Sequence, residues 1–327
     1  MLFFNEKAEN EVKAESQIDI SVLEEERTGR IYQTILVAVS ILAGIKNWGI
    51  ILFLKVFWSR KTPLKKIAWN LGRSDGHKSS MFMDGFSSYN HQAKYGAAGW
   101  RSLKLFYNYE QLEKELCPNL EGLLTRHWMG KMENRKAVTN RLKMVIQHLI
   151  SAFQEFEEEA EIRILSLASG SAQAVIEAMK RCPHLKIRAI LIDLDVGALA
   201  EAKSQAREAG LLDRFKFVQG TTTKMEEVAA DFQPHIVEMV GFLDYRPKGK
   251  AIELLQRIKA ILPEGGIFLT ANIADNKEKI FLDFVLLWPM IYRTEEELED
   301  ILASSGFLEF SLKFEPMGIH GIVYARA

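Results

Sequence analysis

The apolar residues divide the chain into two parts of different character. From residue 161 onward, short apolar runs alternate with amphipathic segments, and small or turn-forming residues follow each run. This alternation predicts parallel strands connected by helices. The predicted strands are Arg163 to Leu167, Ala189 to Asp193, Phe215 to Gln219, Ile236 to Val240 and Ile267 to Ala271. We therefore predict an α/β fold with a Rossmann-like, doubly wound, mostly parallel sheet over residues 161–327.

The end of the chain departs from this alternation. Two apolar runs, Phe310 to Phe314 and Ile319 to Ala325, are joined by the short connection Pro316-Met-Gly318. They predict an antiparallel hairpin at one edge of the sheet. A Thr294 and Glu297 pair at the spacing of a capping box predicts that a helix starts there.

The N-terminal part begins with an acidic arm, residues 1–30, followed by a hydrophobic segment, residues 31–66. The stretch from Ile35 to Trp58 has the length of about 20 residues that a membrane-spanning helix needs. Its interior Lys46 would cost about 3 kcal/mol in a bilayer, and Gly44 to Gly49 resemble a helix break. Two interpretations stay open: membrane contact through residues 31–58, or a pair of short helices that cap the soluble domain.

Basic residues follow this segment and glutamates precede it. Under the membrane interpretation, this charge bias predicts that the C-terminal body lies on the cytoplasmic face, and under the other the protein is soluble and cytoplasmic.

Residues 67–160 predict a helical lid or substrate region. Within it, Met83 to Trp100 is weakly periodic and dense in aromatic and amide side chains, as in a loop that lines a substrate. A surface loop held by aromatic packing is the alternative. The helix predicted from His127 to about Phe156 carries Arg135 and Arg141, which we interpret as solvated unless a carboxylate ligand recruits them.

Composition excludes several classes of protein. The chain of 327 residues is 48% hydrophobic and 26% charged, as ordinary globular proteins are. Its 43 acidic and 42 basic residues give no overall attraction to nucleic acid, and we predict no nucleic-acid partner. The two cysteines and seven histidines have no metal-ligand spacing, so no metal site is expected.

A nucleoside site is predicted where the first two strands end. The first strand leads into the small residues Ala168-Ser-Gly-Ser-Ala172, where backbone can approach a ligand. The second strand ends in Asp193, 23 positions after Gly170. That separation is close to the roughly 20 residues between a glycine-rich turn and the carboxylate that binds ribose hydroxyls.

These motifs resemble the class I S-adenosylmethionine-dependent methyltransferases over roughly residues 142–327. The resemblance rests on the small-residue loop, the acidic strand end, Leu211 to Gly220, Leu262-Pro-Glu-Gly-Gly266 and the C-terminal hairpin. Glu133 to Val145, Ala168 and Gly241-Phe-Leu also resemble a group of bacterial methyltransferases, some of which are fused to lysophospholipase-like hydrolases.

The resemblance implies S-adenosylmethionine as cofactor and a small-molecule or lipid-like methyl acceptor. The implied cofactor-binding residues are Ala168, Ser169, Gly170, Ser171, Asp193, Leu194, Gly220, Thr221 and Val240. Four positions depart from the family pattern: Ser166 replaces the usual acid of the first strand, Ala168 and Ala172 replace glycines, and Thr221 replaces an Asp. The alanines permit the tight turn if their φ is negative.

Asp244, Tyr245 and His91 are the candidate catalytic residues. The first two follow the fourth strand, at the end where open α/β sheets bind ligands. Tyr89 and Tyr95 are weaker candidates, and His320 in the terminal hairpin is expected to be structural. Two other functions stay open: an NAD-dependent oxidoreductase, although Gly170 lacks the fuller glycine pattern, and a non-catalytic binding protein.

Overall fold

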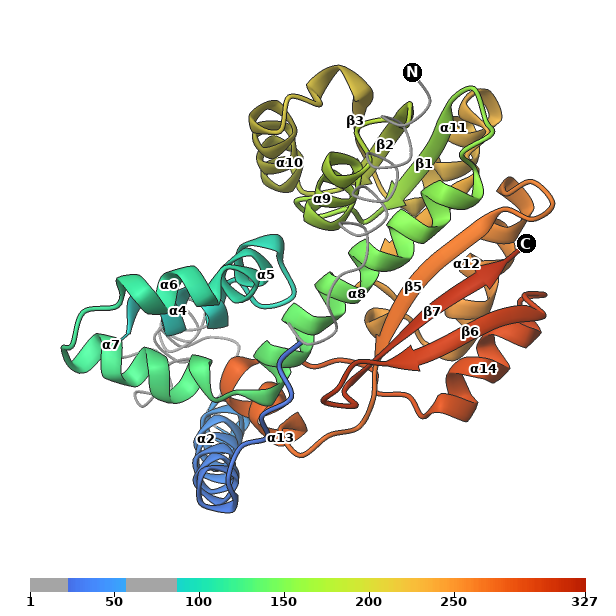
Figure 1. The fold of residues 1–327 in the computed structure, drawn as a ribbon. Coiled ribbons are helices and arrows are strands. Elements are labelled where there is room, and N and C mark those ends of the chain that lie inside the picture. Colours follow the sequence, from blue (N-terminus) through green and yellow to red (C-terminus); the bar gives the residue numbers. More distant parts are fainter. Residues whose placement is uncertain (1–22, 57–86) are drawn as a thin grey trace, which may run out of the picture. The chain divides into compact units, whose positions relative to one another are not determined.

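The computed structural model describes residues 23–56 and 87–327 (Figure 1). The described residues form two compact units. The sheet unit contains residues 23–25, 137–275 and 291–327, and the helical unit contains residues 26–56, 87–136 and 276–290. The predicted boundary at residue 66 lies outside the described residues, and the boundaries at residues 30 and 160 stay predictions. Residues 1–22 and 57–86, which include most of the acidic arm and part of the hydrophobic segment, lie outside the described residues.

A seven-stranded sheet forms the centre of the sheet unit. Its strands are β1 (Ile162–Leu167), β2 (Ile187–Asp193), β3 (Phe215–Gln219), β4 (Ile236–Val240), β5 (Ile267–Ile273), β6 (Glu309–Phe314) and β7 (His320–Arg326). Their order is β3-β2-β1-β4-β5-β7-β6. The first five strands are parallel, and β7 lies antiparallel between β5 and β6. The Rossmann-like fold and the C-terminal hairpin are therefore confirmed.

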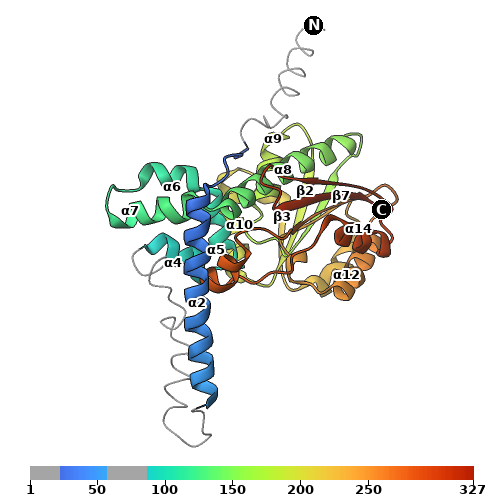
Figure 2. The same ribbon diagram turned by 90° about the horizontal axis from the view of Figure 1, so that it is seen from below.

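Helices cover both faces of the sheet (Figures 1 and 2). They are α8 (Glu133–Glu155), which begins in the helical unit, α9 (Gln173–Arg181), α10 (Val196–Glu208), α11 (Met225–Phe232), α12 (Lys248–Ile261) and α14 (Glu295–Ser304). The capping box of Thr294 and Glu297 starts α14 as predicted. Helices α11, α12 and α14 pack on one face in a continuous apolar core.

The other face of the sheet carries polar side chains beneath α8. Ser166 lies opposite Glu238, and His320 lies opposite Ile273. Because directly opposite residues of adjacent strands project to the same side of a sheet, the register places all of these side chains on one face. Tyr324 is on this face as well, and its hydroxyl donates a 2.6 Å hydrogen bond to Glu155 of α8. The face under α8 therefore holds buried titratable groups, whereas an apolar core packs on the opposite face.

A buried carboxylate fixes the turn between β6 and β7. Glu315 is 1% exposed and accepts hydrogen bonds from the backbone N–H groups of Met317 (2.7 Å), Ile319 (2.7 Å) and His320 (3.2 Å). Asn140 of α8 donates a further bond of 3.3 Å to the same carboxylate. The start of β7 is therefore held against α8.

The helical unit is built around one long helix, α2 (Arg30–Val56). Its other elements are α4 (Ser88–Tyr95), α5 (Trp100–Tyr107), α6 (Tyr109–Glu115), α7 (Leu120–Thr125), η3 (Arg126–Gly130), α13 (Lys279–Phe281) and η7 (Leu282–Leu286). The Tyr32 hydroxyl of α2 donates to the Trp128 carbonyl at 3.0 Å. Glu278 accepts from the N–H groups of Glu133 and Asn134, which start α8.

One of the two open interpretations and one expectation for this region are wrong. Helix α2 runs through Gly44 and Gly49 as one helix, without the break that a pair of short helices needs. The stretch predicted as a loop contains α4, because the Ser87 side chain caps it by accepting from Asn90 N–H. Among the described residues, no helix is both long and apolar enough to cross a membrane.

Replacement of Glu315 by alanine tests the role of this carboxylate in the turn. Three buried backbone donors would lose their acceptor, so we expect Glu315→Ala to lower the free energy of unfolding by about 3 kcal/mol. Glu309→Ala is the matched control in the same hairpin: its exposed ion pair with Arg326 should contribute at most about 1 kcal/mol. Equal losses in urea denaturation of the two variants would contradict this assignment.

Candidate functional site

The loop between β1 and α9 has an unusual backbone. Ala168, Gly170 and Ala172 all have positive φ, at 50°, 55° and 51°. The alanines therefore do not meet the condition of negative φ, and the left-handed conformation costs an alanine about 1 kcal/mol. Strain of this kind persists only where surrounding structure enforces it, and it is commonest at functional sites.

Asp193, the last residue of β2, is one of the groups that enforce this conformation. Its Oδ2 accepts from the N–H of Gly170 at 2.7 Å, and its Oδ1 accepts from the N–H of Asp195 at 2.8 Å. Asp195 instead caps α10, since its Oδ1 accepts from Gly197 N–H at the start of that helix. Asp193 is half-buried, and each carboxylate oxygen has a second lone pair that a ligand can use.

The other predicted cofactor residues surround this carboxylate at the carboxyl edge of the sheet. Gly220 N–H donates to the Asp193 carbonyl at 2.9 Å, and Ser169 N–H donates to the Ile192 carbonyl at 3.2 Å. Leu194 is 67% exposed beside them, an apolar surface next to polar groups. The remaining members are Ser171, which is buried, Thr221, which caps the turn η5 (Thr222–Lys224), and Val240, which ends β4.

Glu238 is a residue of this edge that the sequence analysis missed. It is buried on β4 and accepts from the Ser166 hydroxyl of β1 at 2.5 Å and from Val240 N–H at 3.2 Å. Burial raises the pKa of its carboxyl group to about 7. The sequence carried two signals for this residue. A carboxylate stands inside an apolar strand, and Ser166 stands on another strand where the resemblance implies an acidic residue. Glu238 therefore supplies a carboxylate beside Ser166 from the neighbouring strand.

Arg141 of α8 provides a positive charge at the same place. A Cβ atom at Gly241, whose φ is +81°, would lie 3.6 Å from the Nη2 atom of Arg141. Burial raises the pKa values of Glu238 and Asp244, and the charge of Arg141 partly opposes this rise. At His320, burial and then the charge of Arg141 both lower the pKa. Arg141 is 3% exposed, so its interpretation as a solvated helix arginine is wrong.

Arg135 is also buried, but in the helical unit. Its guanidinium stacks over Tyr109, 4.4 Å from the ring centroid, and donates to the Gly130 carbonyl at 2.9 Å. Arg135 therefore has a packing role in that unit.

The three candidate catalytic residues belong to two different units. Asp244, in the turn η6 (Leu243–Tyr245), is 1% exposed, and its Oδ1 accepts from Ile273 N–H at 2.8 Å. Burial raises the pKa of its carboxyl group. Tyr245 follows it and is half-buried. His91 is exposed in the helical unit, where its ring lies 4.1 Å from that of Tyr95.

Residues 123–327 match the model of a protein family described as "Putative methyltransferase". This match covers more than half of the chain. The chain belongs to this family of methyltransferases.

Solved structures resemble this methyltransferase over most of its length at low sequence identity. A possible exported protein from Bordetella parapertussis is 15% identical, with 73% of this chain and 86% of that chain covered and a TM-score of 0.53. Human N-acetylserotonin methyltransferase in complex with SAM is 15% identical, with coverages of 76% and 70% and a TM-score of 0.43. The mitomycin 7-O-methyltransferase MmcR is 16% identical, with coverages of 78% and 72% and a TM-score of 0.45.

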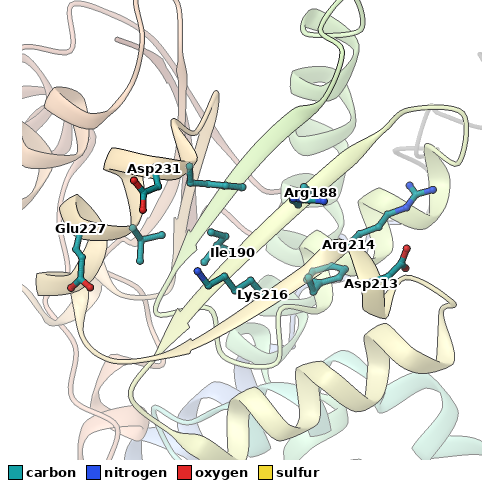
Figure 3. Close-up of a pocket in the computed structure, with 10 residues that line it drawn as sticks. Arg188, Ile190, Asp213, Arg214, Lys216, Glu227 and Asp231 are labelled. Carbon is teal, nitrogen blue, oxygen red and sulfur yellow. The ribbon is translucent and has the colours of Figure 1, made fainter.

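The methyltransferase also has a cavity of about 450 Å³ away from Asp193 (Figure 3). It lies between α11 and the first residues of β3, with Ile190 at its floor, Glu227 and Asp231 on one side and Arg188 and Arg214 on the other. Open α/β sheets bind ligands at the carboxyl ends of their strands, and this cavity lies at the amino end of β3. Among the described residues, no cluster of three or more His, Cys, Asp and Glu side chains is placed to hold a metal.

The raised pKa of Glu238 predicts a pH-dependent stability. Between the ordinary pKa of 4.5 and about 7, only the unfolded chain releases the proton, so the contribution of Glu238 to stability falls as pH rises through this window. Between about pH 4.5 and about pH 8, we expect the free energy of unfolding of wild type to fall by about 3 kcal/mol relative to that of Glu238→Gln. Urea denaturation at several pH values measures this difference. Parallel pH profiles for the two proteins would show that Glu238 is not a perturbed group.

Proposed function

We propose that this methyltransferase uses S-adenosylmethionine and methylates a small-molecule acceptor. The observation that carries the proposal is the Asp193 carboxylate, which joins the Gly170 loop to the end of β2 at the carboxyl edge of the sheet. A carboxylate at that position can accept both ribose hydroxyls of a nucleoside, and a tight loop beside it lets backbone approach the rest of the ligand.

The residues at this edge fit the parts of the cofactor. Ala168, Ser169, Gly170 and Ser171 would hold its amino acid end. The Ser169 hydroxyl supports this role, because it is a buried group with no hydrogen-bond partner in the described part of the chain. Asp193 would hold the ribose hydroxyls, Leu194, Gly220 and Thr221 would flank the adenine, and Val240 would lie beneath the methyl donor.

The protein contributes chiefly by positioning. The bound cofactor supplies an electrophilic methyl group on a sulfonium centre. The loop would hold the amino acid end and Asp193 the ribose, which would favour an in-line approach of the acceptor to the methyl group. Asp244 is bound to the end of β5 through Ile273 N–H, and we assign it to holding β4 and β5 together at this edge rather than to proton transfer.

Two other functions remain as alternatives. An NAD-dependent oxidoreductase would use the same carboxyl edge, but its G-x-G-x-x-G loop would place a third glycine at Gln173, whereas Gly170 is followed by Ser171-Ala-Gln-Ala. A non-catalytic binding protein would keep the site and lack an acceptor. The membership of the chain in a methyltransferase family favours methyl transfer over both.

Asp193→Ala tests the assignment directly. Loss of hydrogen bonds to a charged acceptor should weaken S-adenosylmethionine binding by about 100-fold, measured by isothermal titration calorimetry. The matched control is Asp195→Ala, which removes the neighbouring helix-capping carboxylate and should leave the affinity nearly unchanged. Wild type that bound NAD in place of S-adenosylmethionine, or an Asp193 variant with unaltered affinity, would refute the proposal.

The proposal includes an apolar, lipid-like acceptor reached through contact of α2 with a membrane surface. Ile31, Ile35, Ile41, Leu42 and Ile45 are 41–79% exposed along this helix. Such a stripe, opposite a buried one that contains Leu36, suits a helix lying at a lipid interface. The aromatic residues Phe106, Trp288 and Phe281 give less support, because they are buried against other rings rather than lining a pocket.

A vesicle assay tests the membrane contact. Wild type should sediment with phosphatidylglycerol vesicles, and the double variant Ile35→Ser and Leu42→Ser should bind about 10-fold less, because it loses apolar contact area. Leu308→Ser is the control, since Leu308 is 83% exposed but lies in the sheet unit. Wild type that stays in the supernatant would eliminate the membrane contact and leave the cofactor assignment intact.

A further inference from the structure

His320 is a buried histidine whose hydrogen-bonding capacity is unused. Its side chain is 1% exposed, and neither ring nitrogen has a hydrogen-bond partner in the described part of the chain. Burying a polar group without a partner is costly, so buried imidazoles normally bond to protein, water or ligand. The unpartnered imidazole of His320 therefore requires an explanation, and a hydrogen bond to a ligand would provide one.

The position of His320 is that of a ligand-binding residue. It is the first residue of β7 and lies opposite Ile273, the last residue of β5. Its side chain is therefore at the carboxyl edge of the sheet, on the face that carries Glu238 and Val240. This is the end of β4 and β5 where the proposed function places the methyl donor.

The surrounding structure fixes the backbone of His320. Glu315 accepts from His320 N–H, and Asn140 ties that carboxylate to α8. The next residue along α8 is Arg141, whose positive charge acts on His320. A functional group is most effective when supporting hydrogen bonds fix its backbone and neighbours in this way.

Charged groups from three surrounding elements act on His320 or on its immediate neighbours. The charge of Arg141 on α8 acts on the ring, and Glu315 in the β6–β7 turn accepts from the backbone N–H. Asp244 in η6 accepts from the N–H of Ile273, the residue opposite His320. Burial, and then the charge of Arg141, lower the pKa of His320 well below its ordinary value. The ring is therefore neutral at physiological pH, so one nitrogen can accept a proton.

We propose that His320 accepts the proton of an acidic hydroxyl group on the methyl acceptor, and that Arg141 stabilises the negative charge that develops on the acceptor oxygen. This inference rests on the proposed function and adds the acceptor class, a phenol or enol. The acceptor O–H bond breaks toward a His320 ring nitrogen while the oxygen–methyl bond forms. The methyl–sulfur bond breaks with its electron pair on sulfur, and the imidazolium then releases the proton to solvent.

The environment of His320 selects the acidic hydroxyl. An imidazole destabilised as a cation is a weak base, and proton transfer to a weak base is efficient only from an acidic donor. A nearby guanidinium increases the acidity of a bound hydroxyl further, because it favours the oxyanion. Aliphatic alcohols are therefore poor acceptors for this site, whereas aryl hydroxyls fit it.

A series of acceptors of increasing acidity tests the proposal. With methyl-labelled S-adenosylmethionine, wild type should methylate phenol, 4-chlorophenol and 4-nitrophenol. His320→Gln should lower kcat by about 100-fold with phenol. The loss should be much smaller with 4-nitrophenol, which needs less help to ionise, and the affinity for S-adenosylmethionine should not change. The control is His148→Gln, which replaces a half-buried histidine of α8 that contacts Tyr324 and should retain activity with all three phenols.

Several outcomes would overturn the inference. An equal loss across the series would indicate a structural role, and weaker cofactor binding would place His320 in the cofactor site. Wild type that binds S-adenosylmethionine but methylates none of the phenols would exclude the acceptor class without affecting the proposed function. Wild type that binds no S-adenosylmethionine would instead refute the proposed function itself.

A spectroscopic measurement keeps the test independent of the variant's folding. In the presence of S-adenosylhomocysteine, 4-nitrophenol bound to wild type should show more of the absorbance of its ionised form than free 4-nitrophenol at the same pH. Bound 4-nitrophenol that is no more ionised than the free compound would contradict the role of Arg141 and His320.

Discussion

The site depends on one carboxylate that joins two loops. Asp193 accepts from Gly170 N–H with one oxygen and from Asp195 N–H with the other. The bond to Gly170 helps to hold the first loop in a conformation with three positive φ values, two of them at alanines. Because such a backbone is unfavourable for alanine, the loop needs this external support. The interaction that shapes the loop is thus also the one expected to hold the ribose.

Much of the fold follows from local sequence. The apolar runs of β1, β2, β4 and β5 are near-continuous because these strands are buried on both faces, and the turn residues between them mark their limits. The capping box at Thr294 is likewise a local signal. Helix α4 was missed because its cap, Ser87, stands among residues of weak periodicity. A break in α2 stayed open as an interpretation because Gly44 resembles one, although Phe284 packs against it.

The charged part of the site was not predictable in the same way. Ser166 and Glu238 are 72 residues apart, and only the pairing of β1 with β4 brings them into contact. The helical pattern of α8 predicts a solvated Arg141. Its burial depends on which side of α8 packs on the sheet, which the local sequence does not reveal. The sequence did mark Ser166 as a position where an acid was missing. It did not reveal that Glu238 supplies a carboxylate from the adjacent strand.

A crystal structure of the protein with S-adenosylhomocysteine tests the central claim most directly. The account predicts that both ribose hydroxyls bond to Asp193 and that the amino acid end lies against the loop from Ala168 to Ser171. Density for the nucleoside at any other edge of the sheet, including the cavity beside α11, would contradict it.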